Sequence, residues 1–314
     1  MDYGHPLRLG TFITPSSADP QASVELAVLS ENLGYDVVTF QDHPHQPRLL
    51  DTWTLLSWVA GRTERIQLAP NVLNVVMRPP AVVARAAASL DLLTDGRVSL
   101  ALGTGHFREA MESMGADRLT PGGSVGALAE AVDVIRAIWS AGPSPLHLPG
   151  EHHRLDGASA GPAPAHDIPV WIGGGRPRML RLVAAVADGW VVPGGVAGLP
   201  ALRAGNAVVD DAAARAGRDP REIRRIVNIA GRSPQPPGAS SPGRRRSGSR
   251  TSCPWCSRTA QARWSSRPTT GRRCAASPAT SRRRPAPARP RRRRRRRRLR
   301  AGSRRSPRTR ARAR

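Results

Sequence analysis

The stretch RPPAVVARAAASLDLLTDGRVSLALGTGHF, which spans Arg78–Phe107, contains the pattern that decides the fold of this protein. Its alanine-rich first half, Pro79–Leu93, predicts a helix that ends at the turn residues 94–96. The apolar run Arg97–Leu102 then predicts a buried strand, and a glycine-rich triplet follows it at 103–105. A helix that leads directly into a buried strand is the repeating unit of an α/β protein.

The same alternation continues on both sides of this stretch. Further strands are predicted at Leu7–Thr14, Asp36–Phe40, Ile66–Val76, Ile168–Ile172, Gly189–Val192 and Ile223–Ala230. Further helices are predicted at Pro20–Leu33, from the cap at Asp51 to Val59, and at Ser124–Trp139, Pro177–Ala187 and Leu199–Ala216. Seven such units favour a (β/α)8 TIM barrel with parallel strands, because these barrels run to about 250 residues. One strand of the eight is missing from the count, so we expect an incomplete barrel.

The composition changes abruptly at Arg232 and divides the chain into two parts. Residues 1–232 hold 21 arginines and all 23 acidic residues, a net charge of −2, whereas residues 233–314 hold the other 28 arginines and no acidic residue. We therefore expect one barrel domain over 1–232, with an excursion at 106–167 that includes a loop over Pro143–Asp167. Residues 233–314 are expected to form a disordered, low-complexity tail rich in arginine, proline and serine, because they have almost no apolar side chains to bury.

The barrel part lacks the features of a secreted or membrane protein. It contains no cysteine, since Cys253, Cys256 and Cys274 all lie in the tail, and this excludes a disulfide framework. The first residues do not show the basic region and apolar run of a signal peptide. No apolar run reaches the ~18 residues of a membrane-spanning helix. We expect a cytoplasmic protein without membrane association.

Four segments, in this order and spacing, resemble one family of enzymes. They are YDVVTFQDHPHQ (Tyr35–Gln46), the stretch Arg78–Phe107, IPVWIGGGRPRMLRLVAAVADGW (Ile168–Trp190) and AGRDPREIRRIVNIAGR (Ala216–Arg232). Together they resemble the luciferase-like flavin-dependent oxidoreductases, a superfamily that includes bacterial luciferase, alkanesulfonate monooxygenase and the F420-dependent reductases. The resemblance covers nearly all of residues 7–232 and implies a TIM barrel that uses reduced FMN or coenzyme F420.

Residues at the ends of two strands are candidates for cofactor contacts. They are Gly103, Thr104 and Gly105 after one strand, and Gly173, Gly174, Gly175 and Arg176 after the next. The C-terminal strand ends form the active site of a barrel, and a helix that starts after glycines offers free N–H groups to a phosphate. From the residues alone, both groups also fit simple strand-to-helix turns. The resemblance favours a flavin-phosphate site at Gly173–Gly175, where Arg176 adds a charge-assisted hydrogen bond.

A histidine and an asparagine at other strand ends complete the candidate site. His43 follows the second strand at a position that the resemblance links to function, and its titration near neutral pH suits proton transfer at a flavin. A capped loop histidine is the alternative, and His45 is the second candidate for the role. Asn71 matches a family position near the flavin ring, although asparagine also suits a strand-end turn. The histidines of the excursion lack the spacing of metal ligands, so we expect no metal site.

The family resemblance, together with these strand-end residues, predicts a flavin-dependent oxidoreductase or monooxygenase. Its reduced FMN or F420 would pass a hydride to a small-molecule substrate or activate O2, while the protein supplies orientation and electrostatics. FMN and F420 share a ring-and-phosphate geometry, so the residues leave both open, together with the identity of the substrate. The resemblance also leads us to expect a homodimer and a separate reductase that delivers the reduced flavin.

The tail at 233–314 allows four interpretations. The unbroken run of eight arginines at Arg291–Arg298 suits a nucleic-acid-binding arm, although such binding is non-specific. Cys253 and Cys256 form half of a zinc motif whose second half is missing. A disordered linker is the third interpretation. The fourth is translation out of frame, which would leave an inactive product.

The out-of-frame interpretation can be tested within the sequence. We read each shifted codon as the last base of one codon and the first two of the next, with serine as TCN and arginine as CGN. Ser252–Ser257 then encodes mostly apolar residues, including a valine that is forced because the Trp255 codon ends in G and the Cys256 codon begins with TG. The shifted frame predicts the end of a helix, a glycine turn, a buried strand and a new helix, which together supply the missing eighth unit.

Overall fold

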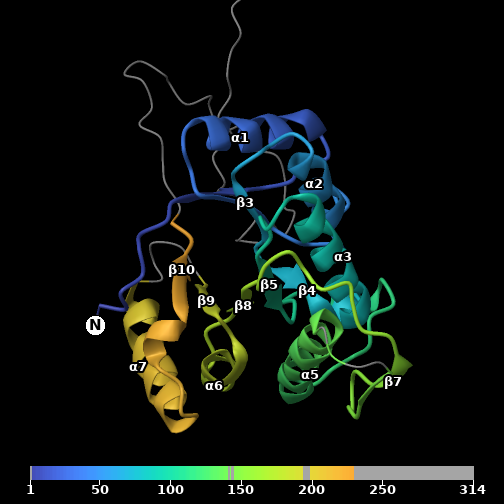
Figure 1. The fold of residues 1–314 in the computed structure, drawn as a ribbon, viewed down its shortest axis with the longest axis vertical. Helices are drawn as coiled ribbons and strands as arrows, with labels where there is room; N and C mark the ends of the chain where they lie inside the picture. Colours follow the sequence, from blue (N-terminus) through green and yellow to red (C-terminus); the bar gives the residue numbers. More distant parts are fainter. Residues whose placement is uncertain (1, 141, 143–144, 194–198, 230–314) are drawn as a thin grey trace, which may run out of the picture. The chain divides into compact units, whose positions relative to one another are not determined.

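Parallel strands and the helices that follow them make up most of the described chain (Figure 1). The computed structural model describes residues 2–140, 142, 145–193 and 199–229, which all belong to the first of the two units of the chain, Met1–Ala260. The strands are β1 (Gly10–Ile13), β2 (Val37–Phe40), β3 (Gln67–Pro70), β4 (Leu73–Asn74), β5 (Leu100–Gly103), β6 (Leu146–Leu148), β7 (Leu155–Ala158), β8 (Val170–Gly173), β9 (Gly189–Val192) and β10 (Arg224–Val227). The helices are α1 (Pro20–Asn32), α2 (Thr52–Ala60), α3 (Pro80–Leu93), α4 (Arg108–Glu112), α5 (Pro121–Trp139), α6 (Pro177–Val186) and α7 (Leu199–Arg215), with short 3-10 turns η1 (Val75–Met77) and η3 (Pro220–Glu222).

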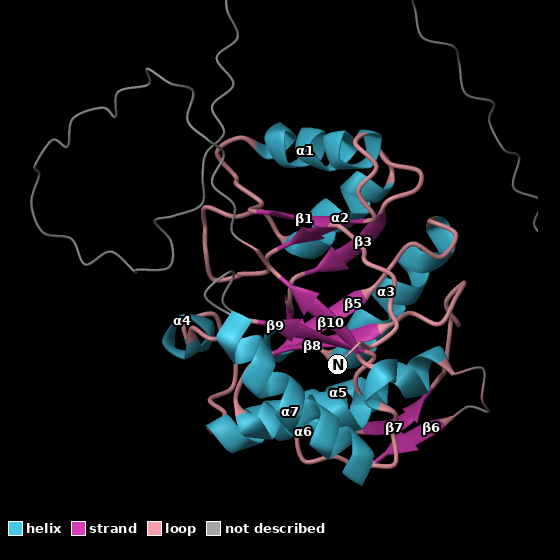
Figure 2. Cartoon of the chain, turned by 90° about the vertical axis from the view of Figure 1, so that its left-hand side faces the viewer, coloured by secondary structure: helices cyan, strands magenta, loops and turns pink. Residues whose placement is uncertain are grey.

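The parallel strands follow one another in the order of a barrel. They form two sheets, β1-β2-β3 and β4-β5-β8-β9-β10. A parallel bridge between Leu68 of β3 and Val98, just before β5, joins the two sheets. Helices α5, α6 and α7 lie along one side of strands β8–β10 (Figure 2). The α/β fold class is therefore confirmed, and within the described ranges no backbone pairing links β10 to β1, where the predicted eighth strand would lie.

Capping side chains begin two helices where the sequence predicts. Oδ1 of Asp19 accepts a hydrogen bond from the N–H of Ala22 (3.2 Å), and Pro20 takes the first position of α1. Oδ1 of Asp51 accepts one from the N–H of Thr54 (2.8 Å) at the start of α2. Such a cap contributes about 1 kcal/mol, because it satisfies an N–H group that has no partner within the helix.

Two segments differ from the sequence-based prediction. The strand expected at Ile66–Val76 is divided into β3 and β4, and a 3-10 turn begins before its end. The physical reason is local: the side-chain oxygen of Asn74 accepts from the N–H of Val76 (3.1 Å), which turns the backbone out of the extended form. The segment Pro143–Asp167, expected as a loop, contains the antiparallel hairpin β6–β7. The carboxylate of Glu130 holds this hairpin, because it accepts from the backbone N–H groups of residues 151–153.

Side chains alternate between the inside of the strand layer and the helices outside it. The inward cluster consists of Val37, Ala69, Val72, Ala101, Trp171, Val191 and Ile226. Most of these side chains are small, and the Trp171 indole is the largest group among them. The neighbouring residues of the same strands face the helices and include Leu100, Leu102, Ile172 and Trp190. The alternation follows from the two-residue period of a strand. Both sets of side chains are apolar, so the polar groups lie mainly at the strand ends.

A buried carboxylate near the end of α3 ties three segments together. Asp91 is fully buried, and it accepts hydrogen bonds from the backbone N–H groups of Val98, Ala165 and His166 (2.9–3.2 Å). The ring Nδ1 of His166 lies 3.0 Å from the same carboxylate. These hydrogen bonds join α3 to Val98, just before β5, and to the segment that precedes β8.

We predict that Asp91→Ala lowers the free energy of unfolding by about 3–5 kcal/mol, because it leaves several buried donors without an acceptor. Urea denaturation measures the change. Asp133→Ala, which removes an exposed carboxylate from α5, is the matched control and should stay within about 0.5 kcal/mol of the parent. A loss below about 1 kcal/mol for Asp91→Ala would mean that these hydrogen bonds contribute little.

Candidate active site

Every predicted site residue lies at the C-terminal end of a strand or just beyond it. His43 lies just beyond β2, and Asn71 lies between β3 and β4. The two glycine groups follow the same rule: Gly103 ends β5 and is followed by Thr104 and Gly105, whereas Gly173 ends β8 and is followed by Gly174, Gly175 and Arg176. Parallel strands of one barrel end on the same side, so the structure brings all of these residues to one end of the strand layer.

The two glycine groups meet at the side chain of Val72. A Cβ atom on Gly103 would lie 2.5 Å from Cγ2 of Val72, and one on Gly173 would lie 3.0 Å from Cγ1 of the same residue. Gly174 has a φ of 146°, and a Cβ atom there would lie 2.6 Å from Cγ of Met179. Close packing and backbone conformation therefore both require glycine at these positions. The turn interpretation accounts for this requirement as well as the cofactor interpretation does.

The start of α6 offers free N–H groups directly after the second glycine group. Arg176 is the N-cap residue, and it makes no side-chain hydrogen bond to the first turn. Its own side chain is exposed and binds no other group in the described part of the chain. A second arginine, Arg178, lies against Gly122 at the start of α5. Free N–H groups, the helix dipole and two cations make this a favourable position for an anion.

His43 and His45 form a ring cluster with Phe107, which follows β5. The ring centroids of His43 and Phe107 are 5.7 Å apart, those of His45 and Phe107 are 4.9 Å apart, and the two imidazoles are 5.4 Å apart. Burial lowers the pKa of His43, His45 lowers it further, and Asp42 opposes both effects. Burial also lowers the pKa of His45. Both imidazoles are therefore neutral at pH 7 and able to accept a proton.

Asn71 binds a residue that the sequence analysis does not single out. Its Nδ2 donates to Oδ1 of Asn228 (2.9 Å), just beyond β10, and Nδ2 of Asn228 donates back to Oδ1 of Asn71 (3.3 Å). Nδ2 of Asn71 also donates to Oγ1 of Thr39 in β2 (3.3 Å). The signal that could have found Asn228 is its position within the family-like segment Ala216–Arg232. Phe107 and its neighbour His106 were missed in the same way, although they follow the GTG triplet directly.

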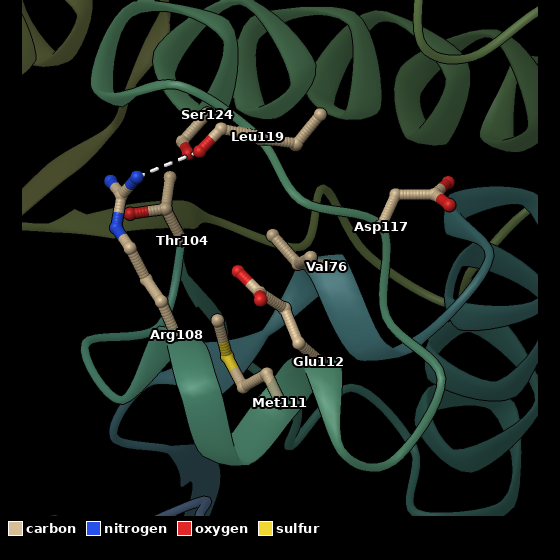
Figure 3. Close-up of a pocket in the computed structure, with 8 residues that line it drawn as sticks. All are labelled: Val76, Thr104, Arg108, Met111, Glu112, Asp117, Leu119 and Ser124. Atoms are coloured by element: carbon tan, nitrogen blue, oxygen red, sulfur yellow. Dashed lines mark hydrogen bonds between the residues drawn. The ribbon is translucent and has the colours of Figure 1, made fainter.

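A small polar recess lies beside Thr104, between the end of β5 and the start of α5 (Figure 3). It is lined by Val76, Thr104, Arg108, Met111, Glu112, Asp117, Leu119 and Ser124. The guanidinium of Arg108 reaches across it and donates to the carbonyl oxygen of Leu119 (2.7 Å), as Figure 3 shows. Thr104 is the one predicted site residue that lines the recess, so the recess adjoins the candidate site rather than containing it.

Two features of the described ranges concern metal ligands and membrane spans. No group of three or more histidine, cysteine, aspartate or glutamate side chains is placed there to hold a metal ion. The three cysteines of the sequence lie outside those ranges. None of the described helices is both long enough and apolar enough to cross a bilayer.

Similarity to known proteins identifies the family. A family model described as luciferase-like monooxygenase matches residues 3–230. The chain belongs to this family. The F420-dependent glucose-6-phosphate dehydrogenase of Kineococcus radiotolerans is 31% identical over 245 residues, which cover 72% of this luciferase-like chain and 68% of the dehydrogenase. The enzyme of the same name from Nocardia farcinica is 31% identical over 230 residues, which cover 71% of this chain and 68% of its own.

Solved structures share the fold of this luciferase-like protein. The coenzyme F420-dependent tetrahydromethanopterin reductase from Methanopyrus kandleri matches it with a TM-score of 0.62 at 22% identity; the match covers 71% of this chain and 65% of the reductase. The oxygenating component of 3,6-diketocamphane monooxygenase from Pseudomonas putida, solved with FMN, has a TM-score of 0.58 at 19% identity, with 70% of this chain and 67% of its own covered. At these identities the likeness concerns the fold alone. The family resemblance and the barrel fold predicted from the sequence are thus confirmed.

Proposed function

We propose that this luciferase-like protein is an oxidoreductase that holds F420 or FMN at the C-terminal ends of its strands. The observation that carries the proposal is the uncapped start of α6, where Gly173–Gly175 lead into a helix with Arg176 exposed beside it. Both cofactors carry phosphate, the group that free N–H groups at a helix start bind. The dehydrogenase relatives named for F420 and the neighbour solved with FMN support the same cofactor class.

The residues present fit such a cofactor. The start of α6 and the Arg176 guanidinium would hold the phosphate. The triplet at 103–105 and the Asn71 amide, which lie at the same end of the strands, would border the ring. The reduced cofactor supplies a hydride to a substrate or electrons to O2. The neutral His43 imidazole would take up or return, at one of its own ring nitrogens, the proton that accompanies this transfer. His45 is the second candidate for this step.

F420 and glucose 6-phosphate are the first cofactor and substrate to test, because they appear in the names of the relatives at 31% identity. Fluorescence titration with F420 and FMN, followed by turnover assays, tests the proposal on a chain whose reading frame is restored after about Arg232. Binding of neither cofactor by a folded protein would remove it. A small-molecule substrate, a homodimer and a partner reductase stay predictions from the family resemblance, and a cytoplasmic location stays a prediction from the sequence features of residues 1–232.

We predict that His43→Ala lowers turnover by about 10²–10⁴-fold and leaves cofactor affinity nearly unchanged, because it removes proton transfer and spares the phosphate site. Steady-state kinetics and cofactor titration measure the two effects separately. His45→Ala is the matched variant and should have little effect. If His45→Ala is the damaging change and His43→Ala is harmless, the role belongs to His45.

The same assignment predicts a pH profile for the active, frame-restored protein with His43 in place. Catalysis needs the neutral form of His43, which exists above its pKa. Since burial and His45 lower that pKa, the rate should fall on the acid side only below the ordinary histidine value of about 6.5. An acid limb centred at or above that value would contradict the assignment.

We further propose that residues 1–232 form the barrel domain, with the excursion at 106–167, and that residues 233–314 are translated out of frame. The family match ends at residue 230, just before the change in composition, which supports this boundary. Residues 230–314 lie outside the described ranges. The nucleotide sequence around codons 232–240 tests the proposal. A gene without a shift there favours the nucleic-acid-binding arm, whose retention on DNA would then have to show sequence preference.

A further inference from the structure

One arginine holds both ends of the loop that carries His43 and His45. Nη1 and Nη2 of Arg78 donate to the two carboxylate oxygens of Asp42 (2.7 and 3.0 Å), and Nη2 also donates to Oδ2 of Asp51 (2.7 Å). Asp42 lies at the start of the loop, just beyond β2, and Asp51 ends the loop as the N-cap of α2. A single guanidinium therefore fixes the loop at its two ends.

The Asp42 end of this arrangement is buried and fully engaged. The side chain of Asp42 is 1% exposed. Besides its two hydrogen bonds from Arg78, its Oδ2 accepts one from the backbone N–H of Asn74 (2.8 Å). A buried carboxylate is costly unless its oxygens are paired, and here three donors pair them. The described residues show no hydrogen bond between Asp42 and the His43 ring.

The groups around His43 come from two segments of the chain. His45 lies on the same loop, Phe107 lies after β5, and the ring of His106 makes an edge-to-face contact with Phe107 at 5.4 Å between centroids. Asp42 is the acidic group that acts on His43, and it raises the pKa of that imidazole, whereas burial and His45 lower it. Because Arg78 already neutralises Asp42, this carboxylate attracts a proton on His43 only weakly.

We propose that Arg78 is a positioning residue of the active site, which fixes the loop 42–51 and keeps the Asp42 carboxylate engaged away from His43. The catalytic role of His43 rests on the proposed function, but the arrangement of Arg78, Asp42 and His43 does not depend on a cofactor. The alternative is a buried ion pair that only stabilises the fold. The two differ in what happens to His43 when the pair is broken.

Histidine NMR titration separates the two possibilities. In Arg78→Gln, Asp42 loses its cation and its charge acts on His43 without that compensation, so the pKa of His43 should rise. In Asp42→Asn the acid itself is removed, so the pKa of His43 should fall. Arg78→Lys keeps the charge and should restore most of the original value. Opposite shifts in the first two variants are expected; no shift of His43 in either overturns the proposal.

The experiment uses the full chain with labelled histidine, with the reading frame restored after about Arg232 if the chain as written does not fold, and thermal melts accompany each titration. His147, which pairs with Asp156 on the β6–β7 hairpin, is an internal reference that should not move. Arg85→Gln is the matched control, because Arg85 binds the carbonyl oxygens of Ser159 and Gly161 away from this loop. If Arg78→Gln does not fold, Asp42→Asn decides alone, and an unchanged His43 pKa in that variant overturns the proposal.

Turnover provides the second measurement. Arg78→Gln should lower kcat by about ten- to hundredfold with little change in KM, because the proton-transfer group is displaced and not the substrate. Its acid limb should move to higher pH, since a raised His43 pKa leaves less neutral imidazole at a given pH. If the NMR shifts appear and neither F420 nor FMN binds, the positioning role stands and the proposed function fails.

Discussion

Residues 1–314 as written should be poorly soluble or partly unfolded, with little or no activity. Restoring the shifted frame after about Arg232 should instead give a soluble barrel that binds its cofactor. The expected effect is large, because a whole strand–helix unit is involved. Folding stability is only ~5–15 kcal/mol in a typical domain, and the loss of one packed unit can remove all of it.

Two apolar surfaces beside β1 support this prediction. Phe12 of β1 faces away from α1 and is 45% exposed. Leu29 of α1 and Leu33, the residue that caps its C-terminal end, are exposed as well. Each stands two residues, or about 200° round the helix, from Glu31, whose carboxylate binds the backbone of residues 64–66 after α2. The leucines therefore face away from α2, toward the side where an eighth helix packs in a complete barrel.

The open edges of β1 and β10 are a second reason to expect instability, because each strand has one edge without a backbone partner in the described part of the chain. Unpaired edges present donors and acceptors that promote aggregation. The first residues contact this side, for example through Arg224 with the carbonyl oxygen of Pro6 (3.3 Å) and Tyr3 with Asp210 (2.8 Å). Residues 233–314 hold 28 arginines and a single leucine, and from this composition we expect no packed layer.

Expression of three versions tests the prediction: the chain as written, residues 1–232 alone, and the frame-restored chain. Thermal melts and cofactor retention are measured on each. We expect a cooperative melt and retained cofactor in the frame-restored chain alone. If residues 1–232 behave like the restored chain, the basic tail is the cause of the instability. If the chain as written melts cooperatively and turns over substrate equally well, the out-of-frame proposal is wrong.

Gly174→Asp should abolish binding of both F420 and FMN. The new carboxylate would stand beside the start of α6, where it would repel the cofactor phosphate and compete for the free N–H groups. Like charges brought together at a binding site cost several kcal/mol, so affinity should fall by at least about a hundredfold. Fluorescence titration with each cofactor measures the loss, and thermal melts confirm that the variant is folded.

Gly174→Ala is the control that isolates the charge. Alanine meets the same obstacles as aspartate, a φ of 146° and a Cβ position 2.6 Å from Cγ of Met179, but carries no carboxylate. The affinity lost in Gly174→Asp beyond that lost in Gly174→Ala is the electrostatic part. Unchanged affinity in Gly174→Asp would remove Gly174 from the site.

Local patterns were sufficient to predict the alternation of strands and helices, the starts of α1 and α2, and the family. The caps at Asp19 and Asp51 depend on residues three positions apart, and the strand and helix periods depend on near neighbours. The order of the family-like segments is a property of the chain itself. For the same reason, His43, Gly103 and Gly173 were expected at strand ends and lie there.

Contacts between distant residues appear only when the strands have become neighbours. Asn71 meets Asn228 across 157 positions, and Arg78 meets Asp42 across 36. No periodicity in the sequence marks either pair, because each depends on which strand ends lie side by side. The sequence alone thus determined the barrel and the end of it that carries the polar residues. The tertiary structure decided which side chains bind one another there, because packing of the strands places donors and acceptors within hydrogen-bonding distance.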